Sequence, residues 1–132
     1  MLSSISSALP KHDADRTMAK LTVIEANDSI TFVGLSGRLD VVGVRSVELE
    51  FTAKTASRRK PTILDLSELE FIASLGMGML LRAAKNLHAY KAGMVILNPG
   101  KLVERALTAA SIDRAIPIAR DPDRAFEILG VK

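Results

Sequence analysis

The sequence has no cysteine and very few aromatic side chains. Its 132 residues include four Phe, one Tyr, no Trp and no Cys. The absence of Cys excludes thiol catalysis, disulfides and cysteine-ligated metal sites. The scarcity of rings disfavours the base stacking used by single-stranded nucleic-acid binders. The formal net charge is only +3, so the composition gives little support for a nucleic-acid partner.

Long apolar runs are also missing. No stretch reaches the roughly 18 to 20 residues that a membrane-spanning helix needs, so no membrane insertion is expected. Residues 1–19 lack the basic start and apolar block of a secretion signal, and we interpret them as a flexible N-terminal tail. Met18 opens the segment "MAKLTVIE" and is a second candidate for the start of translation. These features predict a cytoplasmic protein.

What remains is an ordinary globular composition, 48% hydrophobic and 25% charged, which predicts a single domain over residues 20–132. Residues 21–26 and 29–37 alternate in polarity around Asn27-Asp28, which predicts a β-hairpin. A helix is predicted over residues 41–57, with its apolar face at Val44, Val47 and Phe51. Buried strands are predicted at 62–67 and 94–98, and an edge strand around Pro117.

Three more helices are predicted. One starts near Ser74 and carries a core-facing stripe at Met77, Leu80, Leu81, Ala84 and Leu87. Asn98-Pro99 and Asp121-Pro122 each supply a capping side chain and a first-turn proline for a following helix. The resulting order, β-β-α-β-α-β-α-β-α, predicts an α/β fold in which helices pack on a mixed central sheet.

The chain offers little for catalysis. His12 and His88 are far apart in sequence and are interpreted as surface residues, and neither has an obvious route to activate a serine nucleophile. The carboxylates of Asp65, Glu68 and Glu70 lack the regular spacing of a cation site. We therefore expect a protein that is not an enzyme and that has no cofactor and no metal.

A nucleotide loop is weakly supported. Gly76–Gly78 ("GMG") matches neither the P-loop pattern nor the full G-x-G-x-x-G pattern, because Leu81 occupies the position of the third glycine. The basic segment "SRRK" (57–60) is interpreted as a solvated loop rather than a nucleic-acid patch.

The segment "FIASLGMGMLL" (71–81) holds the main functional signal. Serine is a favoured N-cap worth about 1 kcal/mol, which explains Ser74 in purely structural terms. Each following glycine costs the helix about 0.8–1.0 kcal/mol relative to alanine, and stability alone does not explain that cost. With the predicted core stripe, Leu75, Gly78, Met79 and Arg82 fall on the opposite side, where a partner protein can approach closely.

A phosphate on Ser74 would suit this position. The N-terminus of a helix favours an anion, and phosphorylation would add about −1.5 to −2 charges without melting the helix. The sequence therefore predicts a binding surface that phosphorylation switches.

Three blocks of sequence resemble the STAS domain of bacterial anti-sigma-factor antagonists (anti-anti-sigma factors), over residues 21–129. They are "GLSGRLD" (34–40), "ILDLSELEFIASLGMGMLL" (63–81) and "GMVILNPGKLVERALTAASID" (93–113). The resemblance implies a STAS fold and a role in transcription regulation by partner switching. In that family the unphosphorylated form binds an anti-sigma factor that is also a GHKL-type serine-protein kinase, and so releases the sigma factor. Phosphorylation ends this binding, and a PP2C-type phosphatase restores it.

The family motif maps onto named positions. The phosphate acceptor would be Ser74, Asp40 matches an acidic residue near the acceptor, and Gly76 and Gly78 match two glycines of the family's "DSSGLG" motif. Ala73 replaces an aspartate, which removes a carboxylate beside the acceptor. Leu75 replaces a second serine, which leaves Ser74 as the local acceptor. The predicted partner-binding set consists of Asp40, Leu75, Gly76, Gly78, Met79 and Arg82.

Other functions fit the same fold. STAS domains also serve as constitutive subunits of lipid-transport ABC complexes, as stressosome scaffolds and as tails of anion transporters, the last disfavoured by the absence of a membrane segment. In such a subunit Leu75 and Met79 would be permanent interface residues and Ser74 only a cap. A nucleotide sensor built on Gly76–Gly78 is the weakest alternative.

Overall fold

The computed structural model describes residues 18–131. The predicted tail over residues 1–19, with His12, lies outside the described residues except for Met18 and Ala19. Ala19 is buried in the hydrophobic core. Its burial places the two residues before the first strand within the folded part of the chain.

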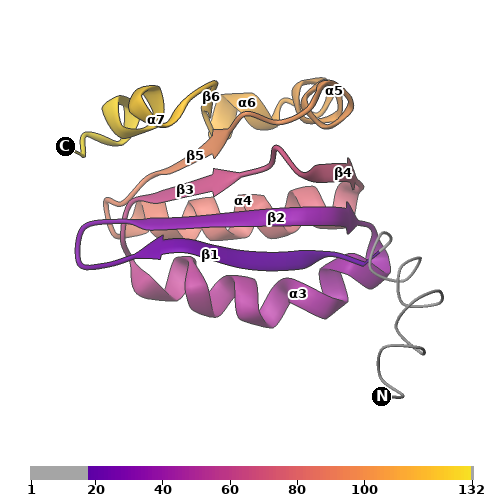
Figure 1. Ribbon diagram of the computed structural model, residues 1–132, viewed down its shortest axis with the longest axis horizontal. Coiled ribbons are helices and arrows are strands. Elements are labelled where there is room, and N and C mark those ends of the chain that lie inside the picture. The colour runs from indigo at the N-terminus through magenta and orange to yellow at the C-terminus, as the bar shows by residue number, and fades with distance from the viewer. Residues whose placement is uncertain (1–17, 132) are drawn as a thin grey trace, which may run out of the picture.

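A mixed six-stranded sheet forms the centre of the molecule (Figure 1). Strands β1 (Lys20–Ala26) and β2 (Thr31–Leu39) pair as the predicted antiparallel hairpin. Strands β3 (Thr62–Asp65), β5 (Met94–Leu97) and β6 (Ile118–Ala119) then extend the sheet in parallel, and β6 lies at its edge as predicted. The prediction of a mixed sheet with helices packed on it is confirmed.

One strand was not predicted from the sequence. Strand β4 (Leu69–Ile72) pairs in parallel with β2 near the end of that strand. Its four residues directly precede the helix that starts at Ser74, and their sequence reads as a connection rather than as a strand. Pairing with β2 determines its structure, and this pairing fixes where the next helix begins.

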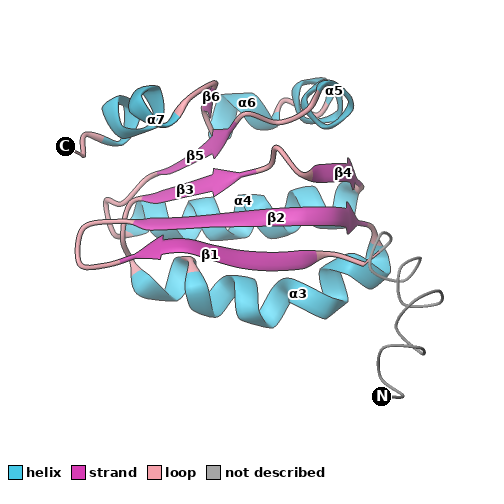
Figure 2. Ribbon diagram, viewed as in Figure 1, coloured by secondary structure: helices cyan, strands magenta, loops and turns pink. Residues whose placement is uncertain are grey.

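Five α-helices accompany the sheet in the described part of the chain (Figure 2). They are α3 (Val41–Lys54), α4 (Ser74–Ala89), α5 (Lys101–Ala109), α6 (Ile112–Ala115) and α7 (Pro122–Leu129), with a 3-10 turn at Ala56–Arg58. Helix α3 buries Val44, Val47 and Phe51 as predicted. The one-turn helix α6 was not predicted, because four residues carry too little periodicity.

The two predicted caps had different outcomes. Asp121 accepts a hydrogen bond from the backbone N–H of Arg124, and Pro122 opens α7, as predicted. The expected cap at Asn98 is wrong, because α5 begins three residues later, after Gly100. Asn98 instead adopts a left-handed conformation with φ +48°, which asparagine tolerates better than most residues.

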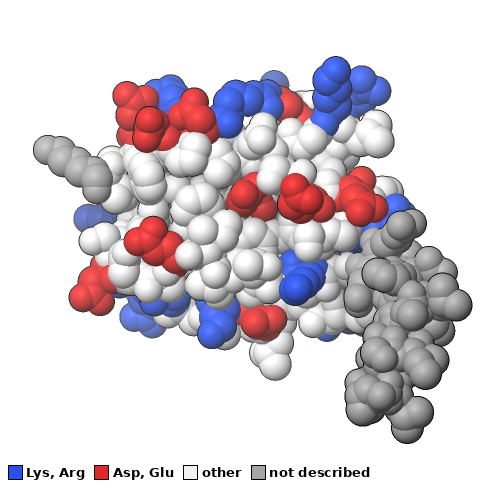
Figure 3. All heavy atoms as spheres, viewed as in Figure 1, with Lys and Arg blue, Asp and Glu red and all other residues white. Residues whose placement is uncertain are grey.

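Alternating residues of the strands face two separate cores. Leu64 of β3 belongs to the main cluster, which includes side chains from α3, α4, α5 and α6. Its neighbour Ile63 belongs to a smaller cluster with Ala125 and Phe126 of α7. Successive strand side chains point to opposite faces, so α7 covers the face opposite to the other helices. The uncovered part of that face carries mostly uncharged side chains, with acidic side chains gathered over the β3–β4 segment (Figure 3).

Candidate functional site

The start of α4 is held against the end of β2. In the β2–β4 pairing Leu39 lies opposite Ile72, and the backbone N–H of Ala73 donates to the carbonyl of Leu39 over 3.0 Å. The chain enters α4 at the next residue, Ser74. The position of this serine is therefore fixed by the sheet.

Ser74 is the first residue of α4 and is exposed. The N-cap is Ala73, which makes no side-chain capping bond, and the first turn contains no acidic residue. The expectation that Ser74 serves as the N-cap is wrong by one position. Capping therefore does not explain the serine, and the positive end of the helix dipole has no carboxylate in its first turn.

Asp40 stands at the start of the neighbouring helix α3. Its Oδ1 accepts from the N–H of Gly43 over 2.8 Å as the N-cap of α3, and its Oδ2 lies 3.7 Å from Nε of Arg38. Asp40 and Ser74 each directly follow one partner of the Leu39–Ala73 hydrogen bond. The N-termini of α3 and α4 thus emerge together where β2 and β4 end (Figure 1).

An ion pair joins the two helices along their length. Nη2 of Arg82 lies 2.7 Å from Oε2 of Glu48, and the two side chains are 59% and 43% exposed. Each residue lies about two turns into its helix. Helices α3 and α4 therefore run side by side in the same direction, with their first turns at the same level.

Two residues of the predicted partner-binding set prove to be buried. Met79 is only 2% exposed, and Gly76 is buried against the end of β2. A Cβ on Gly76 would lie 2.9 Å from Cβ of Leu39 and 3.0 Å from its carbonyl oxygen. The placement of Met79 on the exposed side of α4 was therefore wrong, and Gly76, which the family motif added to the partner-binding set, is not exposed either.

The correction has a physical cause. The missing side chain at Gly76 lets the first turn of α4 approach the backbone of β2, which turns that side of the helix inward. The buried residues of the helix are consequently Gly76, Met79, Leu80, Ala83 and Leu87. The predicted stripe shared Leu80 and Leu87 with this set, whereas Met77, Leu81 and Ala84 are only partly buried.

The other predicted residues lie where the sequence placed them. Leu75 is 42% exposed, Gly78 is partly exposed, and Arg82 is exposed. A Cβ on Gly78 would meet only the guanidinium end of Arg82, at 3.3 Å. The side of α4 next to Ser74 is thus open and thinly covered.

The structure adds three apolar residues that the sequence analysis missed. Val41 and Val42, in the first turn of α3, are 50% and 63% exposed, and Phe71 of β4 is 37% exposed. The guanidinium of Arg38 lies 4.2 Å from the centre of the Phe71 ring. A signal for Val42 was present in the sequence, because this residue lies off the apolar face predicted for its helix. Val41 is three residues before Val44 and falls on that face, so its exposure could not be predicted.

We call this region the Ser74 surface. It consists of the exposed or partly exposed residues at the shared end of α3, α4, β2 and β4: Arg38, Asp40, Val41, Val42, Glu48, Phe71, Ser74, Leu75, Gly78 and Arg82. Two cations and two carboxylates balance on it, and its apolar members are Val41, Val42, Phe71 and Leu75.

The rest of the described chain shows neither a metal site nor a membrane-spanning helix. It contains no group of three or more His, Cys, Asp or Glu residues that could hold a metal ion. Within residues 18–131, no helix has the length and apolar character needed to cross a membrane. The pKa of Glu104 is lowered by its hydrogen bond with Arg120, but this pair joins α5 to the segment after β6, away from Ser74.

Comparison with known families agrees with the fold and gives it a name. The family model described as the STAS domain matches residues 22–125. A search of curated proteins finds no significant match.

Solved structures of similar fold include an anti-sigma factor antagonist from Mycobacterium paratuberculosis. It is 25% identical with a TM-score of 0.71, and the alignment covers 84% of this chain and 95% of that one. The anti-sigma factor antagonist SpoIIAA in its unphosphorylated form is 17% identical, with a TM-score of 0.67 and coverages of 86% and 99%. The Bacillus cell fate determinant SpoIIAA in its phosphorylated form is 17% identical, with a TM-score of 0.58 and coverages of 83% and 99%.

Proposed function

The chain belongs to the STAS domain family, and we propose that it acts in the bacterial cytoplasm as an anti-sigma-factor antagonist whose binding is switched at Ser74. In its unphosphorylated form it binds an anti-sigma factor that is also a GHKL-type serine-protein kinase, and thereby releases the sigma factor. The kinase phosphorylates Ser74, binding ends, and a PP2C-type phosphatase restores the hydroxyl. In this role the protein is a regulator rather than an enzyme.

One observation carries the proposal: an exposed serine without a capping role opens α4 on a surface that also exposes apolar side chains. Burial of apolar surface is the dominant favourable term in most protein–protein association. Val41, Val42 and Leu75 offer such contacts to a partner.

Charge explains why a phosphate would end binding. Arg38 is close to Asp40, and Arg82 is paired with Glu48, so these four side chains sum to zero formal charge. A phosphate on Ser74 would bring the surface to about −1.5 to −2. Desolvating that charge against an apolar partner surface is costly, while the N-terminus of α4 stabilises it in the free protein. The switch therefore changes affinity and leaves the fold intact.

Phosphorylation is tested directly with the cognate GHKL-type kinase and ATP. Intact-mass spectrometry should show the gain of one phosphate, and the variant Ser74→Ala should not gain it. Ser67→Ala is the matched control, because Ser67 is also exposed but lies before β4. A phosphate that persists on Ser74→Ala would remove Ser74 from the proposal.

Binding is tested with Ser74→Asp and the control Ser67→Asp against the same kinase. Ser74→Asp should lower the affinity, whereas Ser67→Asp should leave it unchanged, and both should retain the far-UV circular dichroism of the wild type. Equal affinity of Ser74→Asp and wild type would contradict the switch. That result would favour a constitutive STAS subunit, as in a lipid-transport ABC complex or a stressosome-like scaffold.

A further inference from the structure

A second candidate site lies at the opposite end of α4 from Ser74. An open cleft of about 950 Å³ is bounded by the last turns of α4, the turn before β5, the connection from α6 to β6 and the end of α7. This volume is at the upper end of the range typical of small-molecule sites. The lining of the cleft begins at Leu81, which lies about 10 Å along α4 from Ser74.

The floor and walls of the cleft are apolar. The large apolar side chains among its lining residues are Leu81, Met94, Pro117, Ile128 and Leu129. Small residues, Ala84, Ala89 and Ala115, leave room between these walls. A Cβ on Gly93 would lie 3.0 Å from Cδ2 of Leu129, so the end of α7 packs directly on the turn before β5 and holds that wall in place.

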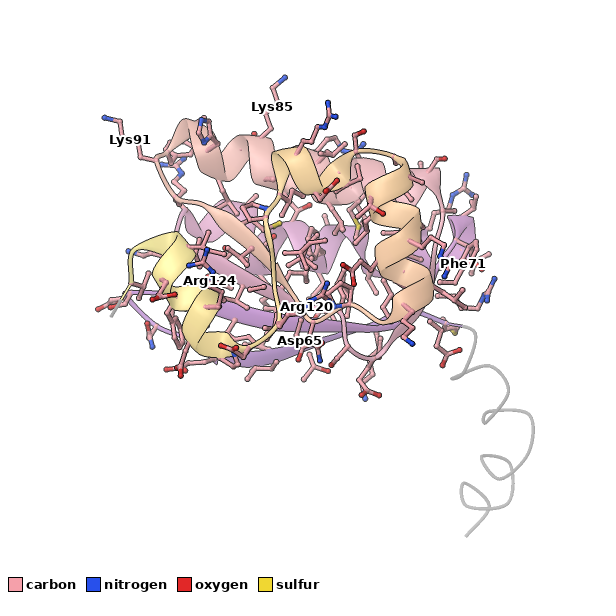
Figure 4. The ribbon with its side chains drawn as sticks, turned by 90° about the horizontal axis from the view of Figure 1, so that it is seen from above. Asp65, Phe71, Lys85, Lys91, Arg120 and Arg124 are labelled. Carbon is pink, nitrogen blue, oxygen red and sulfur yellow. The ribbon has the colours of Figure 1, made fainter. Side chains whose placement is uncertain are left out.

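The polar part of the cleft is cationic. Lys85, His88 and Lys91 line it, and no lining residue is acidic. All three side chains are exposed, and among the ion pairs of residues 18–131 none involves them. Lys85 and Lys91 project from the same edge of the molecule, and Phe71 lies toward the other end (Figure 4).

Helix stability explains only half of this arrangement. A basic residue in the last turn of a helix suits the helix dipole, which accounts for His88. It does not account for the apolar side chains that line an open cleft beside the basic residues, and an apolar cleft with a few polar groups is typical of a small-molecule site. An apolar floor under a purely cationic rim complements a ligand with an alkyl chain and one anionic head.

We infer that this cleft binds a small amphipathic carboxylate of the straight-chain fatty-acid class. The alkyl chain lies between α4 and α7, along Leu81, Met94 and Leu129, and the carboxylate lies at Lys85 and Lys91. The inference does not depend on the function of Ser74, because the two sites share no residue.

Calorimetric titration with dodecanoate below its micelle concentration tests the inference on the full chain. Dodecanoate should bind at one site per protein. Acetate has the carboxylate without the alkyl chain and should not bind detectably. Dodecyltrimethylammonium has the alkyl chain with a positive head and should bind at least tenfold more weakly than dodecanoate. Equal affinity for the two dodecyl compounds would show detergent-like adsorption and overturn the inference.

Variants locate the site. Lys85→Glu combined with Lys91→Glu should weaken dodecanoate binding at least tenfold, because both rim charges are reversed. Lys54→Glu combined with Arg105→Glu is the matched control, since it makes the same charge change at exposed positions outside the cleft. Equal loss of affinity in both double variants would show that the net charge of the protein causes the effect, and it would contradict the site.

A steric variant provides an independent check. Ala115 is exposed at the end of α6 and lines the cleft, so Ala115→Trp should fill the space without disturbing the core and should abolish binding. Unchanged affinity of this folded variant would exclude the cleft. Binding to vesicles containing anionic phospholipid, without binding to monomeric dodecanoate, would assign the cationic rim to a membrane surface and overturn the inference.

Discussion

Gly76 of α4 lies so close to Leu39 of β2 that a Cβ on the glycine would be 2.9 Å from the Cβ of the leucine. The same Cβ would lie 3.0 Å from the carbonyl oxygen of Leu39, so the backbone of β2 also takes part in this close approach. Neither atom belongs to a flexible side-chain end that could move aside. This approach sets the rotation of α4 and therefore decides which of its residues reach the Ser74 surface.

The first prediction compares the two glycines of α4. Gly76→Ala should destabilise the protein by about 1–3 kcal/mol, the usual range for overpacking. Gly78→Ala should stabilise it by up to about 0.8–1.0 kcal/mol, because alanine is the better helix former and its Cβ would meet only the mobile end of Arg82. Urea denaturation of both variants measures the difference, and a similar effect of the two changes would contradict the close packing at Gly76.

The second prediction separates Ser74 from the true caps. Ser74→Ala should change the free energy of unfolding by no more than about 0.5 kcal/mol, as for a surface substitution. Asp40→Ala and Asp121→Ala each remove a side chain that accepts from a helical N–H, and each should cost about 0.5–2 kcal/mol. Thermal or urea unfolding of the three variants provides the test. A cost for Ser74→Ala as large as for the two aspartates would show that its hydroxyl has a structural role after all.

The third prediction concerns the corrected orientation of α4. Met79 is 2% exposed and belongs to the main core, so Met79→Ala should cost about 2–5 kcal/mol. Leu75, which is 42% exposed, should lose little stability on change to alanine but should lose affinity for the kinase partner. Chemical denaturation and a binding assay on the two variants measure both effects. The reverse pattern would restore the helix orientation expected from the sequence.

The fourth prediction is a pH dependence at Glu104. Its hydrogen bond with Arg120 lowers the pKa of the carboxyl below its ordinary value of 4.5. A carboxylate with a lowered pKa in the folded state contributes stability above the unfolded pKa, and that stability is lost as the pH falls through the folded value. Wild type should therefore be more stable than Glu104→Gln at neutral pH, and the difference should shrink below pH 4.5. Urea midpoints over this range measure it, and a difference independent of pH would contradict an ionised pair.

The hairpin, the apolar face of α3 and the capped start of α7 were all predictable from local sequence. Asn27 illustrates why: its Oδ1 accepts from the backbone N–H groups of Ser29 and Ile30, so the turn depends on atoms three residues apart at most. Asp121 and Pro122 likewise determine the start of α7 within one turn. Exposed Ser74 and Leu75 followed from the start of α4, which the sequence placed to within one residue.

Strand β4, the inward rotation of α4 and the apolar residues around Ser74 were decided by contacts between distant parts of the chain. The four residues of β4 become a strand because β2, some thirty residues earlier, offers them backbone hydrogen bonds. Met79 is buried because Gly76 allows α4 to approach Leu39, a relationship that helical periodicity does not contain.

By itself, the sequence determined which segments alternate in polarity, where α3 and α7 begin and which serine stands at the start of α4. Tertiary structure alone decided which side of that helix faces solvent, and it brought the first turn of α3, with Val41 and Val42, to the same end of the sheet as the serine. The physical reason is range: capping bonds and turn geometry act between neighbours in the chain, whereas close packing and strand pairing join atoms that only the folded state brings together.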